Sequence, residues 1–206
     1  MRIDHAIIAA RDIEAVAARL WERHGLASLP GGRHPGWGTY NRIVPLGGPY
    51  LEIIGIADER EARGDPMGRR LLAHRAAGDP LMGWCCETDE IDGVAQRLGL
   101  TLEPGARDRP DGTRLSWRLA GRDVALGERP FFIAWDDPQS RPGLLAAPHA
   151  VEVRGIARVE VGCGPEQLEG WVDPDIPVRA LGGDGGGGLR AVVIATAAGE
   201  IRLTGG

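Results

Sequence analysis

The sequence predicts an α+β fold in which a unit of one strand, one helix and further strands occurs twice. An apolar strand followed by an amphipathic helix appears near the N-terminus and again after residue 80. The two helices lead into matching segments, HGLASLPGGRHPGWGT and LGLTLEPGARDRPDGT. Pro30 and Pro104 are 74 residues apart, as are Gly38 and Gly112, and such self-similarity indicates duplication of one supersecondary unit.

The first unit spans residues 1–58. Residues 3–9 read as an apolar strand, and Asp12 is expected to cap a helix whose apolar side chains recur at helical spacing until Gly25 ends it. After turn residues, strands are expected over 38–46 and 50–56.

The second unit spans residues 81–137, and both units form one domain over 1–140. A strand over 81–87 is followed by a helix that starts after Thr88 or Asp89 and stops at Gly99. Strands over 114–119 and 131–135 complete this unit.

A weaker third copy of the unit is expected over residues 151–206, packed on the same domain. Its elements are a strand over 156–161, a short helix over 165–172, and strands over 189–195 and 200–204. The order of these elements follows that of the first two units.

Composition excludes several classes of protein. The 206 residues carry a formal net charge of -5, with 24 basic and 29 acidic side chains, which argues against a nucleic-acid partner. We expect no membrane segment, because no apolar run reaches the length that a spanning helix requires. The 3 cysteines fit no disulfide framework, so a cytoplasmic location is expected.

The segments IDHAIIAARD, GGRHPGWGTYN, YLEII, RPDGTRLSWRL and PFFIAW resemble the glyoxalase-like branch of the vicinal oxygen chelate superfamily, a branch of bacterial proteins. That superfamily includes glyoxalase I, extradiol dioxygenases and bleomycin-resistance proteins. The resemblance implies that the paired units form a curled mixed sheet, a half-barrel with the helices outside. It also implies a ligand groove between the units, with metal ligands on the first and fourth strands of each.

Mapped onto this sequence, the resemblance places His5 on the first strand and Glu52 on the fourth. Strand alternation puts His5 on a face with Ile3 and Ile7, and Glu52 on a face with Tyr50 and Ile54. His5 and Glu52 are therefore expected to bind one divalent metal, for which Zn, Ni, Fe and Mn are all compatible, or to form a catalytic pair without one.

The second unit departs from the metal-binding pattern. Sliding the repeats together sets Trp84 opposite His5 and Ile133 opposite Glu52, and neither is a usual metal ligand. His34 is the candidate for the missing ligand or for a third catalytic residue. This expectation requires the glycine-rich segment 31–41, interpreted as a loop, to fold inward.

Substrate-binding residues are expected on the same loop and on the strands of the second unit. The candidates are Trp37, Asn41, Trp84, Trp117 and Trp135. For the tryptophans, filling a hydrophobic core is the alternative interpretation. Arg33 and Arg107 occupy equivalent positions in the two copies, so we expect both to serve shared fold geometry.

Two functions stay open at the level of sequence. The first is an enzyme that acts on a small molecule with adjacent oxygens, by lyase, isomerase or dioxygenase chemistry. The second is a non-catalytic protein that binds or sequesters a small molecule, as resistance proteins do. The sequence leaves monomer and homodimer equally open.

Overall fold

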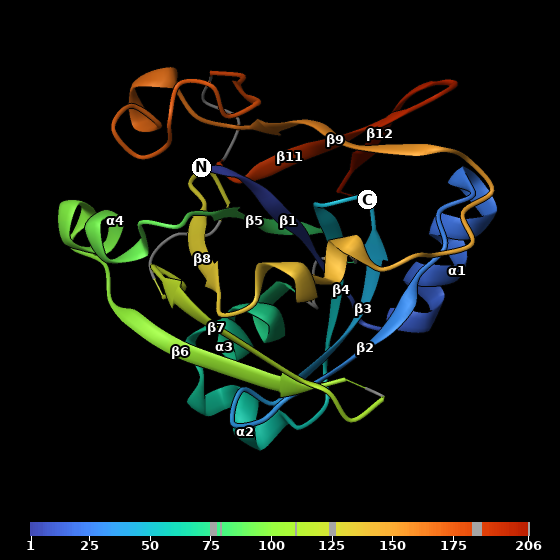
Figure 1. Cartoon of the computed structure of the whole chain (residues 1–206), viewed down its shortest axis with the longest axis horizontal. Coiled ribbons are helices and arrows are strands. Elements are labelled where there is room, and N and C mark those ends of the chain that lie inside the picture. The colour runs from blue at the N-terminus through green and yellow to red at the C-terminus, as the bar shows by residue number, and fades with distance from the viewer. Residues whose placement is uncertain (75–77, 79, 110, 124–126, 183–186, 206) are drawn as a thin grey trace.

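The computed structural model describes residues 1–74, 78, 80–109, 111–123, 127–182 and 187–205. An eight-stranded sheet has the order β2-β3-β4-β1-β5-β8-β7-β6, and a four-stranded sheet has the order β10-β9-β11-β12. The eight-stranded sheet is strongly curled, with α1 and α4 on opposite flanks (Figure 1). Among the described helices, none is both long and apolar enough to span a membrane.

The first module has the predicted order of elements. Asp12 caps the first helix by accepting hydrogen bonds from the backbone of Glu14 and Ala15, and Gly25 ends it in the left-handed region at φ 66°. The elements are β1 (Arg2–Ala9), α1 (Ile13–His24), β2 (Leu29–His34), β3 (Thr39–Pro45) and β4 (Tyr50–Ile56).

The second module repeats this order, which confirms the predicted duplication. Its elements are β5 (Leu81–Glu87), α4 (Ile91–Leu98), β6 (Leu102–Asp108), β7 (Arg114–Ala120) and β8 (Phe131–Trp135). In each module the first strand runs parallel to the last, and the antiparallel pair β1 and β5 joins the modules. Two further helices, α2 (Glu59–Gly64) and α3 (Pro66–His74), connect them.

The C-terminal segment forms strands where they are expected but pairs them differently. Its elements are β9 (Val153–Val161), β10 (Val178–Ala180), β11 (Leu189–Thr196) and β12 (Gly199–Thr204). Here the first strand lies between the second and third, whereas in the modules it pairs with the last. The expected helix over 165–172 is reduced to a 3-10 turn at Pro165–Gln167, and Gly170 at φ 69° is incompatible with its continuation.

The eight-stranded sheet separates two hydrophobic cores. The outer-face core contains Trp84 and Phe132 and packs against α1, α4 and apolar side chains of the four-stranded sheet such as Val192. In Figure 1 the C-terminal strands cross the molecule beside β1 and β5. The inner-face core lies on the concave side and includes Met67 and Leu71 of α3.

The two edge strands of the curled sheet, β2 and β6, meet across the concave side. Arg107 of β6 donates a hydrogen bond from Nη1 to the carbonyl oxygen of Gly31 in β2, at 2.7 Å. A Cβ at Gly32 would lie 2.6 Å from the carbonyl oxygen of Asp108, so only glycine permits this close approach. The sheet is therefore almost closed around its inner face.

Two register shifts decide which side chains enter the concave side. In β2 the pairing with β3 shifts between Pro30 and Gly32, and in β1 the pairing with β5 shifts between Ile3 and His5. A β-bulge reverses the alternation of side chains beyond it. Ile3 therefore lies in the outer-face core, not beside His5 as alternation alone predicts.

The glycine-rich segment is also different from its sequence-based interpretation. Gly31 to His34 are the end of strand β2, and only the residues between His34 and Thr39 form a turn. The inward position of His34 thus comes from a strand with a bulge, not from a folded loop.

Candidate functional site

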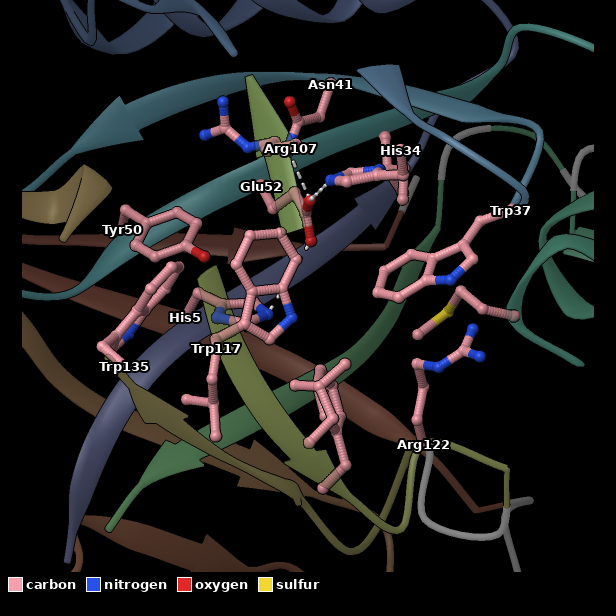
Figure 2. Close-up of a pocket in the computed structure, with 15 residues that line it drawn as sticks. His5, His34, Trp37, Asn41, Tyr50, Glu52, Arg107, Trp117, Arg122 and Trp135 are labelled. Carbon is pink, nitrogen blue, oxygen red and sulfur yellow. Dashed lines mark hydrogen bonds and ion pairs between the residues drawn. The ribbon is translucent and has the colours of Figure 1, made fainter. Parts of the chain in front are cut away.

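A cavity opens on the inner face of the curled sheet, lined by side chains from both modules and from α3. Its volume is about 40 Å³, which on a scale of about 10–15 Å³ per water corresponds to a few water molecules. Figure 2 shows that polar side chains of the first module face aromatic side chains of the second.

Glu52 lies at the centre of the polar side of the cavity. Asn41 donates a hydrogen bond from Nδ2 to Glu52 Oε1 at 2.6 Å. His34 Nε2 lies 3.9 Å from the same oxygen, and His5 Nε2 lies 3.7 Å from Glu52 Oε2 (Figure 2). The structure therefore brings His5, His34, Asn41 and Glu52 together from four strands.

The bulge in β2 fixes the orientation of Asn41. The backbone N–H of Gly32 donates to Asn41 Oδ1 at 2.9 Å, so the amide nitrogen is the atom that faces Glu52. A side chain at Gly31 would overlap this Asn41 oxygen. The two adjacent glycines thus hold the amide that positions the carboxylate.

The buried carboxylate of Asp4 orients the imidazole ring of His5. Its Nδ1–H donates to Asp4 Oδ1 at 2.5 Å, and the second oxygen of Asp4 accepts a hydrogen bond from Trp135 Nε1 at 2.8 Å. A carboxylate accepts but does not donate, so Nδ1 carries the proton and Nε2 of a neutral ring is free to accept one. The ring stacks on Tyr50 at a centroid distance of 4.7 Å.

His34 is held in its neutral form. Its Nδ1 shares a hydrogen bond of 2.9 Å with the Thr39 hydroxyl, and the side chain is buried. Burial is the main cause that lowers the pKa of His34 to about 4, while the carboxylate of Glu52 partly opposes it. At neutral pH this ring therefore offers one donor and one acceptor.

The lowered pKa predicts a specific dependence of stability on pH. Between pH 6.5 and about 4, His34 is protonated in the unfolded chain but stays neutral in the folded chain. The free energy of unfolding therefore falls as the pH falls. The loss approaches about 3 kcal/mol near pH 4. Urea denaturation between pH 7 and pH 4.5 should show a smaller acid-induced loss for His34→Gln than for the wild type.

The matched control for this prediction is His74→Gln, which removes a histidine of α3 outside the cavity. Parallel pH curves for the wild type and His34→Gln would contradict the assignment of His34 as a buried neutral ring.

The aromatic side of the cavity is formed by three of the candidates for substrate binding, Trp37, Trp117 and Trp135. Trp117 packs edge-on against both other indoles, with centroid distances of 6.3 Å to Trp37 and 5.3 Å to Trp135. Trp84 does not belong to this wall. It is fully buried in the outer-face core and donates from Nε1 to the carbonyl oxygen of Glu128 at 3.3 Å.

The misplacement of Trp84 has a simple geometric reason. Pairing sets His5 opposite Cys85, so Cys85 rather than Trp84 occupies the inner face of β5. Alternation then directs Trp84 to the other side of the sheet. The substrate-binding role predicted for Trp84 is therefore wrong.

Three polar residues of the cavity were not predicted as site residues, namely Tyr50, Arg107 and Arg122. Burial raises the pKa of Tyr50 well above its usual value, so its hydroxyl stays a donor. Arg122 stacks over Trp37, with the guanidinium carbon 4.3 Å from the ring centroid. The sequence pattern did indicate that Tyr50 faces the cavity, because Tyr50 shares the predicted strand face of Glu52.

Whether a metal ion fits this site depends on which donor atoms lie close together. In the described part of the chain, one group of three side chains has its possible metal-binding atoms within 4.8 Å of one another. This group is Asp4, His5 and Cys85. Burial raises the pKa of the Cys85 thiol well above its usual value, and Asp4 already accepts two hydrogen bonds. His5, His34 and Glu52 offer three donors from the first module, but among the described residues they do not bring one ligand atom each within 4.8 Å of one another, and the second module faces them with Phe131 and Ile133. This set does not fit the three protein ligands of a resident catalytic metal.

Comparison with known proteins identifies relatives of this fold. A family model described as Glyoxalase-like domain matches residues 3–174. A hypothetical protein from Staphylococcus aureus superposes with a TM-score of 0.68 at 14% identity, over 98% of each chain. No match was found among curated proteins.

Solved structures of methylmalonyl-CoA epimerase are also similar, but more distantly. The Streptomyces coelicolor enzyme, in complex with 2-nitronate-propionyl-CoA, gives a TM-score of 0.48 at 17% identity, over 66% of this chain and 99% of that chain. The enzyme from Mycobacterium tuberculosis gives 0.43 at 17% identity, over 65% and 85%. At this level of identity the likenesses concern the fold alone.

Proposed function

Because this chain belongs to the glyoxalase-like domain family of the vicinal oxygen chelate superfamily, we propose that it binds a small molecule in the inner cavity and catalyses proton transfer on it. The observation that carries the proposal is the position of Glu52, whose carboxylate lies between the imidazoles of His5 and His34 at 3.7 and 3.9 Å. The reaction class is an isomerase or lyase step that begins with removal of a proton next to a carbonyl group.

Glu52 acts as the general base in this proposal. The Asn41 amide fixes its carboxylate by the 2.6 Å hydrogen bond, and the Glu52 residue is buried. His34 Nε2 is the hydrogen-bond partner for a developing enolate oxygen, since this ring is uncharged at neutral pH.

His5 is the second acid–base group. Asp4 holds its Nδ1–H, so the proton that His5 gains or loses is at Nε2, the atom that faces Glu52. Since His5 Nε2 lies 3.7 Å from Glu52 Oε2, a proton that Glu52 removes can pass to His5 and return to a neighbouring atom of the substrate. A proton shift of this kind is the step of an isomerase.

The proposed reaction uses no metal, since His5, His34 and Glu52 do not bring one ligand atom each within 4.8 Å of one another. The test is to incubate the full-length protein in D2O, with EDTA, with a panel of small ketones, 2-oxo acids and 2-hydroxy ketones, and to follow loss of C–H signals by NMR. We expect exchange above the protein-free rate for at least one compound class, unchanged by EDTA. Exchange that EDTA abolishes and Zn, Ni, Fe or Mn restores would return the divalent metal to His5 and Glu52.

A non-catalytic binding protein is the second candidate. It is favoured by the apolar residues that face the polar group from the second module, Cys85, Phe131 and Ile133. The same experiment separates the two functions, because a binding protein would perturb the signals of a ligand without exchanging its protons.

A further inference from the structure

Arg107 is a buried cation in the cavity without an acidic partner. Its side chain belongs to β6 and the residue is 4% exposed. The other buried arginine of the cavity, Arg122, lies 2.8 Å from both Asp65 and Glu103. In the described part of the chain, by contrast, no carboxylate forms an ion pair with Arg107 within 4.0 Å.

The hydrogen bonds of Arg107 leave most of its guanidinium free for a ligand. Among the described residues, its side chain donates one hydrogen bond, from Nη1 to the Gly31 carbonyl. Burial is the main cause that lowers the pKa of Arg107, and the negative charge of Glu52 opposes it only in part. A buried charge that is compensated only in part is costly, so an anion that enters the cavity would be favoured.

A second donor lies near this cation. The Tyr50 hydroxyl makes no hydrogen bond to another described residue, and the charge of Arg107 partly opposes the rise in the pKa of Tyr50. Tyr50, Arg107 and Glu52 all line the cavity (Figure 2). A guanidinium with a phenolic O–H is a donor set for a planar oxyanion.

We propose that the ligand of this cavity carries a carboxylate group, bound by Arg107 and the Tyr50 hydroxyl. The inference rests on the proposed function only in taking the inner cavity as the ligand site. The cavity is small, about 40 Å³, and Glu52 and Arg107 both line it. The substrate class is therefore a small carboxylic acid.

The test measures how binding depends on the charge of the ligand. Acetate, pyruvate and benzoate are titrated against the full-length protein beside acetamide, pyruvamide and benzamide, with inorganic phosphate as a further anion. The fluorescence of Trp37, Trp117 and Trp135 reports occupancy because all three line the cavity. We expect at least one carboxylate to bind tenfold or more tightly than its amide.

Variants then assign the charge preference to Arg107. Arg107→Gln should remove the difference between carboxylate and amide, and Arg107→Lys should retain part of it. Arg114→Gln is the matched control, because Arg114 of the neighbouring strand is exposed and pairs with Asp108 at 3.1 Å. If loss of the Gly31 contact unfolds Arg107→Gln, the comparison of wild type with Arg107→Lys decides.

Three results would overturn the proposal. They are equal binding of the carboxylates and their amides, a preference that survives in Arg107→Gln, and binding of phosphate with no carboxylate bound. Failure of the proposed function is a separate result. If Glu52→Gln leaves proton exchange unchanged but carboxylate binding still requires Arg107, Glu52 is not the base. The carboxylate site at Arg107 is then still supported.

Discussion

Glu52→Gln is expected to lower the rate of proton exchange by about 10²–10⁴-fold, the usual contribution of a general base. Glutamine keeps the shape of the side chain and an oxygen that accepts from Asn41 Nδ2, so the cavity should persist. It removes the basic carboxylate between His5 and His34. The measurement is the exchange rate in D2O with the substrate identified from the panel.

The control for this prediction is Glu22→Gln, which changes an exposed glutamate of α1 and should leave exchange unaltered. Carboxylate binding to Glu52→Gln should be retained or tightened, since a negative charge has left the cavity. Unchanged exchange in Glu52→Gln, with ligand still bound, would rule out Glu52 as the base.

Arg122→Met is expected to destabilise the fold by about 3–5 kcal/mol, the typical effect of removing one partner from a buried ion pair. Arg122 Nη1 donates to Asp65 at 2.8 Å, and its Nε and Nη2 donate to Glu103 at 3.1 and 2.8 Å. Burial alone would lower the pKa of Arg122, but the hydrogen bonds to Asp65 and Glu103 raise it. The guanidinium of Arg122 therefore stays protonated. Methionine would leave the buried carboxylate of Asp65 without its cation.

Urea denaturation at pH 7 measures this effect. Arg63→Met is the control, because Arg63 pairs with Glu59 on the exposed surface of α2 and its loss should cost at most about 1 kcal/mol. Adding Asp65→Asn to Arg122→Met should recover part of the lost stability, as the orphaned charge disappears. A loss below about 1 kcal/mol in Arg122→Met would show that the buried pair contributes little.

Arg122 also connects the scaffold to the cavity. Its guanidinium packs on the Trp37 ring, which closes one side of the aromatic wall. Arg122→Met should therefore weaken ligand binding even at temperatures where the variant stays folded. The two consequences can be separated by measuring binding and unfolding on the same sample.

Much of the fold could be predicted from local patterns. The apolar strands, the Asp12 cap and the Gly25 and Gly99 stops are local features, and the structure has them where they were expected. Pairing within a sheet is not local, so the order of the C-terminal strands could not be inferred from the sequence of elements. The expected helix over 165–172 stops after the 3-10 turn at Pro165–Gln167, because Gly170 adopts a positive φ of 69°.

The candidate site was predicted only in part. Alternation correctly placed Tyr50, Glu52 and Ile54 on one face because β4 has no bulge in its pairing with β3. The same rule misplaced Ile3 and could not locate Asp4 behind His5, because the register of β1 shifts between Ile3 and His5. A periodic rule fails wherever one extra residue enters a strand.

The sequence by itself determined the duplicated unit, the main strands and helices, and the polar pair His5 and Glu52. Only the tertiary structure decided which residues of the two repeats face the cavity. The register shift in β2 turns His34 inward and Arg33 outward, whereas β6 pairs without a shift and turns Arg107 inward and Asp108 outward. Equivalent positions thus have opposite orientations, because a bulge is set by pairing with the neighbouring strand and by the close approach that Gly31 and Gly32 permit.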